Sequence, residues 1–391
     1  MDMMTESEQT TKYGGWASVY VVGLTTFAVV TTEMLPVGLM TAIARAMDVS
    51  VGTAGFIISA PAILAAFFAP VVVAIAGDID RRKILAGLLT VLTVANIASA
   101  IAPSFQWLLV ARVAVGFCMG GIWAVAGGLA PRLAPAQSVG VATAIIFGGV
   151  AAASVMGVPL GAMIGDAAGW RWAFGTMAGF SATVLGLSLL VLPALPVNQS
   201  IGFSKFTAVL KHRLVQLGLI LTLLLVAGHF MAYTFIGPLL RTVSGVAPEW
   251  IAALLFIYGA AGIVGNFLAG TMAAKRLGLT LGSIIIGLSA AILGFAVLGE
   301  TPATTLGLLV LWGLAYGGVS VTLQIWMMKA APSAIEIVTA LFVSIFNIGI
   351  AAGSFLGGLT VDHIDLHANL LFAAILPAFA LLLMFVLQRR D

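Results

Sequence analysis

Charged side chains and cysteines are scarce in this chain of 391 residues. Only 8% of the residues are charged, whereas soluble domains carry about 25%. A soluble protein of this length could not cover its surface with so few charges. The single cysteine, Cys118, excludes a disulfide framework and a metal site built from several thiolates. Hydrophobic residues make up 61% of the chain, so a multi-pass membrane protein is the class that fits.

A small excess of basic residues gives a formal net charge of +3. These residues lie in short segments between apolar runs, where they determine membrane topology. We therefore expect the lipid bilayer to be the chain's surroundings and expect no nucleic-acid partner.

Twelve apolar runs approach the ~20 residues that a helix needs to cross a membrane. They lie near residues 16–40, 52–76, 84–101, 106–130, 139–164, 172–192, 214–240, 249–271, 281–298, 303–328, 336–361 and 369–388. The sequence therefore predicts an all-α polytopic membrane protein with twelve transmembrane helices.

Basic residues are distributed unevenly among the segments that join these helices. With the N-terminus inside, thirteen fall in inner segments and three in outer loops. This positive-inside bias predicts cytoplasmic N- and C-termini in a cell membrane, which is the inner membrane in a bacterium.

An internal repeat relates the two halves of the chain. A shift of 196 residues aligns 144–161 with 340–357 and pairs Gly157 with Gly353 and Gly161 with Gly357. Six helices per half preserve orientation, so the repeat is parallel, about an axis along the membrane normal. We expect a six-helix bundle at 1–192, a cytoplasmic linker at 193–212 and a second six-helix bundle at 213–391.

Several motifs carry a family resemblance. They are GDIDRRK at 77–83, LLVARVAVGFCMGG at 108–121, GVPLGAMIGDAAGWRWAF at 157–174, TTEMLPVGL at 31–39 and GHFMAYTFIGP at 228–238. Together they resemble the major facilitator superfamily and its twelve-helix drug:proton antiporter subgroup. Within it, the chain looks most like sugar efflux transporters and the arabinose and purine ribonucleoside efflux permeases.

The resemblance implies two bundles that alternate access to a central cavity lined by helices one, four, seven and ten. It also implies a small-molecule substrate, the proton as coupling ion, no other cofactor and a monomer.

Three ionisable residues, Glu33, Arg112 and His229, fall within apolar runs, where a charge costs several kcal/mol or more. The rise of ~1.5 Å per residue places all three in the outer half of the membrane. We predict that they couple transport to protons. The alternatives are structural: Glu33 pairs with Arg112 or lies at the outer interface, Arg112 ties helix four to helix one through a carboxylate or carbonyls, and His229 packs or binds solute.

Further polar and aromatic residues within the apolar runs are candidates for solute binding. Alongside His229 they are Trp123, Tyr233, Trp312, Tyr316, Gln324 and Asn347. Packing between helices is the alternative for each aromatic residue.

Two segments are candidates for gating. Asp80, Arg81 and Arg82 form an acidic-then-basic loop that either latches the inner ends of the bundles or only anchors topology. The segment with Gly157, Pro159 and Gly161 lets helices approach closely and bends helix five.

These observations predict proton-coupled efflux of small solutes, such as sugars or sugar-like and amphipathic compounds, by alternating access. A multidrug or nucleoside exporter and an uncoupled facilitator are the alternatives. We expect no enzymatic activity, because the sequence offers neither a nucleophile paired with a base nor a metal cluster.

Overall fold

The computed structural model describes residues 15–75, 79–126, 129–135, 138–196, 204–299 and 301–388, and within these ranges every regular element is a helix. The helices are α2 (Gly15–Ala46), α3 (Val51–Ala54), α4 (Phe56–Ile75), α5 (Arg81–Ala100), α6 (Phe105–Ala126), α7 (Ala130–Leu133), α8 (Val139–Ala168), α9 (Trp170–Val191), α10 (Ser204–Leu210), α11 (Arg213–Tyr233), α12 (Ile236–Thr242), α13 (Pro248–Leu298), α14 (Pro302–Ala330), η2 (Pro332–Ala334), α15 (Ile335–His363) and α16 (Leu366–Gln388).

The twelve expected transmembrane helices are present. Eleven helical stretches in the described ranges are long and apolar enough to cross a membrane, and α8, with 30 residues, supplies the twelfth. Helices α3 and α4 share the second span, and α11 and α12 share the seventh. Spans eight and nine form one element, α13, which departs from helical geometry at Arg276 (φ −139°, ψ 64°).

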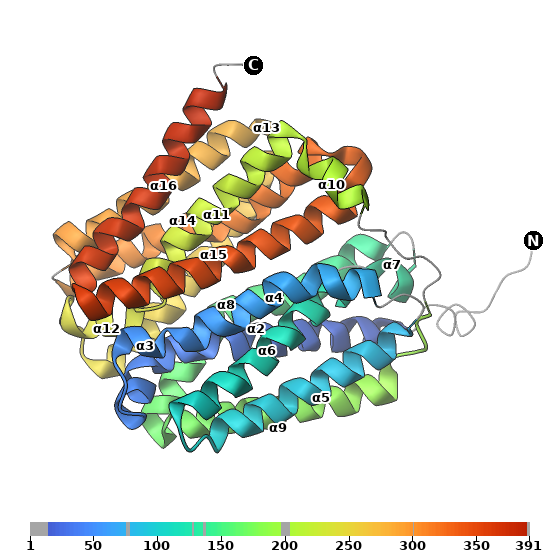
Figure 1. Ribbon diagram of the computed structural model, residues 1–391, viewed down its shortest axis with the longest axis horizontal. Coiled ribbons are helices and arrows are strands. Elements are labelled where there is room, and N and C mark those ends of the chain that lie inside the picture. Colours follow the sequence, from blue (N-terminus) through green and yellow to red (C-terminus); the bar gives the residue numbers. More distant parts are fainter. Residues whose placement is uncertain are drawn as a thin grey trace, which may run out of the picture.

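The helices form two groups that lie side by side (Figure 1). In this view α11–α16 occupy the upper part of the molecule and α2–α9 the lower part. The groups meet where α15 packs on α4, α13 on α8, and α12 on α2. We call the end that carries α3 and α12 the α3 end, and the opposite end, with α7 and α10, the α10 end (Figure 1).

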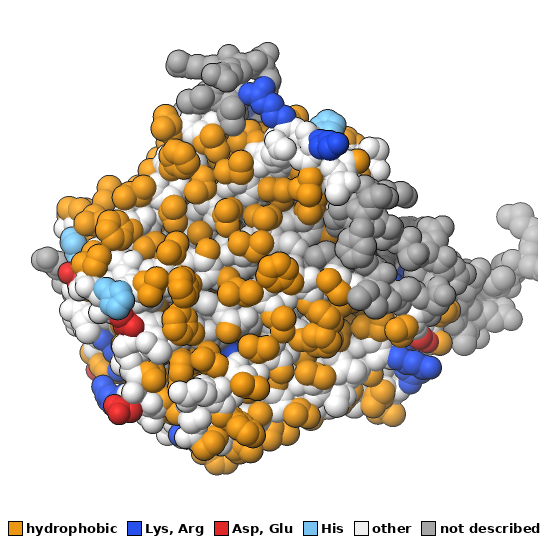
Figure 2. All heavy atoms as spheres, viewed as in Figure 1, with side chains coloured by type: hydrophobic (Ala, Val, Ile, Leu, Met, Phe, Trp, Pro, Cys, Tyr) orange, Lys and Arg blue, Asp and Glu red, His pale blue; other side chains and the backbone are white. Residues whose placement is uncertain are grey.

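Hydrophobic side chains cover most of the face seen in Figure 2, and most of the charged side chains lie near its edges. This distribution is that of a protein whose middle faces hydrocarbon and whose ends face water.

The internal repeat is visible in the packing. A Cβ at Gly161 of α8 would lie 2.6 Å from the main-chain oxygen of Leu35 in α2. The corresponding residue 196 positions later, Gly357 of α15, would bring a Cβ 2.6 Å from the oxygen of Met231 in α11. Met231 also follows Leu35 by 196 residues, so both halves use the same glycine to bring the same pair of helices together.

The segment between the halves has some regular structure of its own. The interval 193–212, expected to be a cytoplasmic linker, contains the short helix α10. Residues 197–203 of this interval, and residues 1–14 of the expected first bundle, lie outside the described residues.

A carboxylate joins the two groups at the α3 end. Asp362 of α15 accepts hydrogen bonds from the Gly52 amide (2.9 Å), the Thr53 hydroxyl (3.2 Å) and the Ser50 hydroxyl. Gly52 is required there, because a Cβ would collide with the main-chain oxygen of Gly358. These contacts hold α3 against α15 across the boundary between the groups.

A second contact at the same end is an ion pair between Arg241 of α12 and Asp166 of α8, at 3.5 Å. Asp362 follows Asp166 by 196 residues, so the repeat supplies an acidic residue to each of the two contacts. The α3 end is therefore closed by two related carboxylates.

We expect the Asp362→Ala substitution to open the α3 end more often, because three donors lose their acceptor, each worth roughly 1 kcal/mol. The measurement is the labelling rate of a Thr41→Cys side chain by a water-soluble maleimide, in detergent and with Cys118 replaced by Ser. Thr41 lines the small pocket beside Arg241.

The expected result is a rate at least ~5-fold higher, since one lost hydrogen bond of that strength corresponds to about this factor. The matched control is Asp365→Asn, an exposed neighbour whose carboxylate accepts from the Ala368 amide within its own group. Equal labelling rates in the Asp362→Ala variant and the parent would show that Asp362 does not hold this end closed.

Candidate functional site

Two prolines leave main-chain carbonyls without helical partners inside the membrane. Pro36 lies in α2 and Pro61 in α4, and proline has no N–H to donate to the carbonyl four residues earlier. The carbonyls concerned are those of Thr32 and Ile57. Because no water is available in the hydrocarbon core, these oxygens need donors from the protein.

Arg112 of α6 supplies these donors. Its Nη1 donates to the Thr32 oxygen at 3.0 Å and its Nε donates to the Ile57 oxygen at 3.2 Å. A longer bond of 3.4 Å runs from Nη2 to the main-chain oxygen of Glu33. The side chain is fully buried, and its Cζ lies 5.9 Å from the ring centroid of Phe174. One rigid guanidinium therefore braces α6 against both proline-bearing helices.

Glu33 lies one residue beyond this brace. Its side chain is 6% exposed, and its Oε1 has no hydrogen-bond partner among the described residues. The positive charge of Arg112 acts on it through a Coulombic interaction. A carboxyl group so placed needs a proton, a cation or a donor from a bound molecule.

His229 occupies the equivalent position in the second half, 196 residues after Glu33. It is 1% exposed on α11, and its Nδ1 accepts a hydrogen bond of 3.0 Å from the Nε1–H of Trp312 in α14. The ring stacks against Tyr316, with centroids 3.3 Å apart and planes inclined by 9°. It also stacks against Tyr233, at 4.8 Å and 23°.

A further aromatic residue, Tyr258 of α13, completes this group. It stacks against Tyr233 at 4.8 Å and meets Trp312 edge-on at 6.1 Å. The sequence prediction missed it because the aromatic candidates all lie in spans four, seven and ten, and Tyr258 lies in span eight. The available signal was its rarity: the whole chain has only five tyrosines.

The aromatic group and the carboxylate face each other across the boundary between the halves. The hydroxyl of Tyr316 is buried without a hydrogen-bond partner among the described residues, and it interacts electrostatically with Glu33. We call Glu33, His229, Tyr233, Tyr258, Trp312 and Tyr316 the central site. The structure thus brings together Glu33 with four of the residues expected to bind solute.

Other expected solute-binding residues lie elsewhere. Trp123 of α6 packs against the hydrophobic core of the first half. Gln324 donates to the Thr339 hydroxyl at 2.8 Å, which joins α14 to α15. Asn347 donates to the Val343 carbonyl of its own helix, while its Oδ1 is buried and has no partner among the described residues.

The expected gating loop contacts its own half. Asp80 accepts hydrogen bonds from the amides of Arg82 and Leu195, both at 2.9 Å. The Arg81 amide donates to the Leu195 oxygen at 3.0 Å, and the Arg82 guanidinium donates to the oxygen of Leu189. In this conformation the loop ties the start of α5 to the end of α9.

The glycine–proline segment of α8 also packs within its own half. Gly157 and Gly161 both face α2, where a Cβ at Gly157 would lie 3.4 Å from Thr31 and Met34. Pro159 is buried between them in the same helix.

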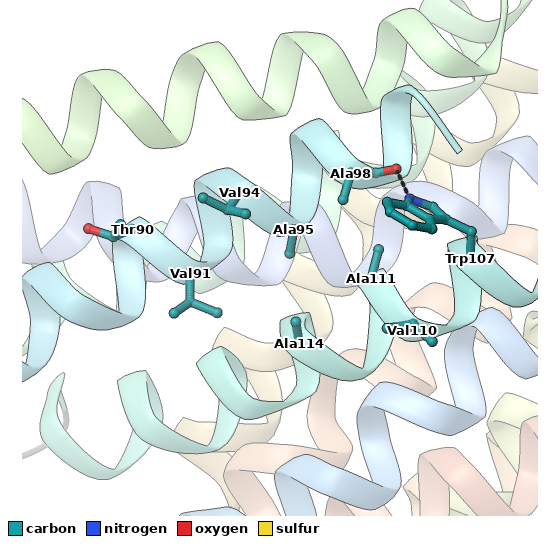
Figure 3. A pocket seen from close by; sticks show the side chains of 9 residues that line it. All are labelled: Thr90, Val91, Val94, Ala95, Ala98, Trp107, Val110, Ala111 and Ala114. Carbon is teal, nitrogen blue, oxygen red and sulfur yellow. Dashed lines mark hydrogen bonds between the residues drawn. The ribbon is translucent and has the colours of Figure 1, made fainter. Parts of the chain in front are cut away.

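A cavity of 320 Å³ between α5 and α6 is a poor candidate for the solute site (Figure 3). Its lining consists of apolar side chains and Thr90, and the indole of Trp107 at one end donates to the Ala98 oxygen at 3.0 Å. Val94 and Val110 on its rim are 59% and 71% exposed, which places it on the surface that faces lipid.

Comparison with known proteins agrees with this architecture. Residues 22–342 match the family model of the Major Facilitator Superfamily. The chain belongs to this superfamily. It is 32% identical over 390 residues to the transcription regulatory protein OpdE of Pseudomonas aeruginosa, covering 98% of this chain and 97% of the relative.

Solved transporters share the fold. A bacterial homologue of the human lysosomal transporter Spinster, inward-facing and occupied, superposes with a TM-score of 0.74 at 15% identity, covering 95% of this chain and 96% of that one. The nucleoside transporter NupG superposes with a TM-score of 0.75 at 16% identity, covering 95% and 99%. The chain is therefore a multi-pass membrane transporter of small solutes.

The bracing role of Arg112 can be measured. We expect Arg112→Lys to lower the free energy of unfolding in detergent by about 2 kcal/mol, because an ammonium keeps the charge but cannot reach both helices. In a Pro36→Ala background the Thr32 oxygen regains a main-chain donor, so the loss should shrink by about 1 kcal/mol.

Pro159→Ala is the matched control, since its helix is braced by neither of these arginine bonds. The losses of unfolding free energy from Arg112→Lys and Pro159→Ala should simply add. If the losses from Arg112→Lys and Pro36→Ala are also additive, the double-mutant cycle contradicts the link between Arg112 and Pro36.

Proposed function

We propose that this transporter exports small solutes, such as sugars or sugar-like and amphipathic compounds, in exchange for protons. The observation that carries the proposal is the Glu33 carboxyl group, which is buried at the boundary of the halves with Oε1 unpartnered among the described residues. A group in that position can bind a proton in one conformation and release it in another, which converts a proton gradient into a bias between conformations.

Arg112 supports this role for Glu33 in an indirect way. Its hydrogen bonds go to carbonyls, so it lowers the electrostatic cost of a charged Glu33 without occupying the carboxylate by a direct hydrogen bond. We include Arg112 in proton coupling as the residue that sets the local field.

The polar atoms near the boundary favour a solute with several hydrogen-bonding groups. Glu33 Oε1, the Tyr316 hydroxyl and Asn347 Oδ1 are all buried and unpartnered among the described residues. A polyhydroxylated solute can form hydrogen bonds with these groups, which offsets the free-energy cost of burying them. Trp312 and Tyr233 supply an apolar wall and His229 a polar edge, and Gln324 and Trp123 are included as more distant contributors.

The alternatives are an exporter of drugs or nucleosides and an uncoupled facilitator. The likeness to NupG and to the Spinster homologue is below 25% identity and supports the fold alone. The name of OpdE describes that protein, and the superfamily match supports transport for this chain.

We infer that the bundles 1–192 and 213–391 rock about the central site, joined by the segment 193–212, in a monomer of the inner membrane. The closed α3 end faces outward and the α10 end faces the cytoplasm, as the positive-inside bias predicts. The loop with Asp80, Arg81 and Arg82 holds the inner ends of α5 and α9 together. The segment with Gly157, Pro159 and Gly161 lets α8 move against α2.

The orientation has a direct test in topology reporters. A phosphatase that is active only outside the cytoplasm should be active when fused after Gly245 and inactive when fused after Lys211. Activity after Lys211 would reverse the proposed orientation.

Coupling is tested by Glu33→Gln, which keeps size and hydrogen bonding but cannot titrate. In inverted membrane vesicles we expect this variant to retain counterflow of the transported probe and to lose accumulation driven by a pH gradient, down to the level without a gradient. The probes are radiolabelled L-arabinose, inosine and ethidium, which represent the sugar, nucleoside and drug alternatives.

Glu249→Gln, an exposed carboxylate at the start of α13, is the matched control and should behave like the parent. If Glu33→Gln concentrates the probe as well as the parent, the proton travels elsewhere. If the parent itself ignores the pH gradient, the chain is an uncoupled facilitator.

A further inference from the structure

The hydrogen bond between Trp312 and His229 fixes where the imidazole carries its proton. An indole nitrogen only donates, so the His229 Nδ1 that receives the bond at 3.0 Å must present a lone pair. A neutral imidazole has one proton for its two nitrogens, and it therefore sits on Nε2. An imidazolium has protons on both nitrogens and cannot accept this bond.

We propose that Trp312 is a positioning residue that holds His229 neutral with its proton on Nε2, so that His229 donates a hydrogen bond to the solute and leaves the coupling proton to Glu33. The part that concerns solute rests on the proposed function. The part that concerns the imidazole rests on the contact between the two side chains alone.

Burial of the two side chains disfavours any other protonation of His229 than the one with its proton on Nε2. Trp312 is fully buried and His229 is 1% exposed. If Nδ1 gained a proton, two N–H groups would point at each other, and the indole would lose its partner where water cannot replace it. The rings of Tyr316 and Tyr233 pack against the faces of the imidazole, so its edge is the part left for polar contacts.

The other titratable groups near His229 are few. Tyr233 lies on the same helix, Tyr258 on α13 and Tyr316 on α14. Glu33 of α2 interacts electrostatically with Tyr316, and Arg112 interacts in the same way with Glu33. Helices α15 and α16 also pack on α11. Their described charged or titratable side chains lie toward the α3 end and are Asp362, His363 and His367, and Asp365 lies in the turn between the two helices.

The negative charge of an ionised Glu33 favours an imidazolium, and the indole N–H opposes it. The direct hydrogen bond involves the imidazole nitrogen itself and selects which nitrogen holds the proton. We therefore assign the tautomer of His229 to Trp312, while burial disfavours the charged ring.

The inference gives different tasks to two positions that the internal repeat makes equivalent. Glu33 and His229 are 196 residues apart and occupy corresponding places on α2 and α11. Glu33 has an unpartnered oxygen and can exchange a proton. His229 has its accepting nitrogen occupied and can only donate.

The test is nitrogen NMR of the full-length protein in detergent, labelled with ¹⁵N-histidine, at pH 5.5 and pH 8.0. His229→Gln identifies the resonances of His229. In the parent we expect one protonated nitrogen, Nε2, at both pH values. The exposed His212, His363 and His367 remain in the His229→Gln spectrum, which separates their resonances from those of His229.

Trp312→Phe keeps an aromatic ring and removes the N–H. In this variant burial still disfavours a charged ring, so we expect a neutral imidazole whose single proton is shared between Nδ1 and Nε2 at both pH values. Tyr258→Phe is the matched control from the same cluster and should leave the parent pattern unchanged.

A parent His229 that is protonated on Nδ1 would overturn the proposal, as would a Trp312→Phe spectrum identical to the parent's. The parent spectrum decides the tautomer without any substitution, so a poorly folded variant does not prevent the test. No solute and no gradient is needed, so the outcome is independent of whether Glu33→Gln abolishes coupling.

Discussion

The requirement that every buried carbonyl find a donor inside the membrane organises the first half of this protein. Pro36 and Pro61 lie within α2 and α4, and each leaves one oxygen without a helical partner. A single guanidinium, that of Arg112, serves both oxygens. The two helices are thereby held in one arrangement, and Glu33 lies next to one of the braced carbonyls.

The internal repeat explains why the second half presents a titratable group at the same level. Gly161 and Gly357 bring α8 onto α2 and α15 onto α11 in the same manner. Equivalent backbone positions therefore carry Glu33 and His229. Their chemistry differs because their neighbours differ. Near Glu33, the Arg112 guanidinium donates to main-chain carbonyls, whereas at His229 the Trp312 indole N–H donates to Nδ1 of the imidazole.

The sequence predicted the fold and part of the central site. Hydropathy sufficed for twelve spans because each must be apolar along its length, and helix rise placed Glu33, Arg112 and His229 in one layer. The sequence did not predict the place of Tyr258 or the contacts of Asp362. Both depend on how the helices are rotated and packed, which hydropathy does not encode. The rotation of α6 also explains why Trp123 lies outside the central site. Its side chain packs against the core of its own half.

A third proline shows how the same constraint separates rigid parts from moving ones. Pro70 leaves the oxygen of Ala66 in α4 without a helical donor, and the hydroxyl of Ser344 in α15 donates to it at 2.8 Å. The donors at Pro36 and Pro61 come from the same half and would persist in the proposed rocking of the halves. The donor at Pro70 comes from the opposite half, so separation there would leave the oxygen to another donor or to entering water. Under the proposed mechanism, the prolines of the first half thus distinguish bonds that hold a bundle together from a bond that separation of the halves breaks.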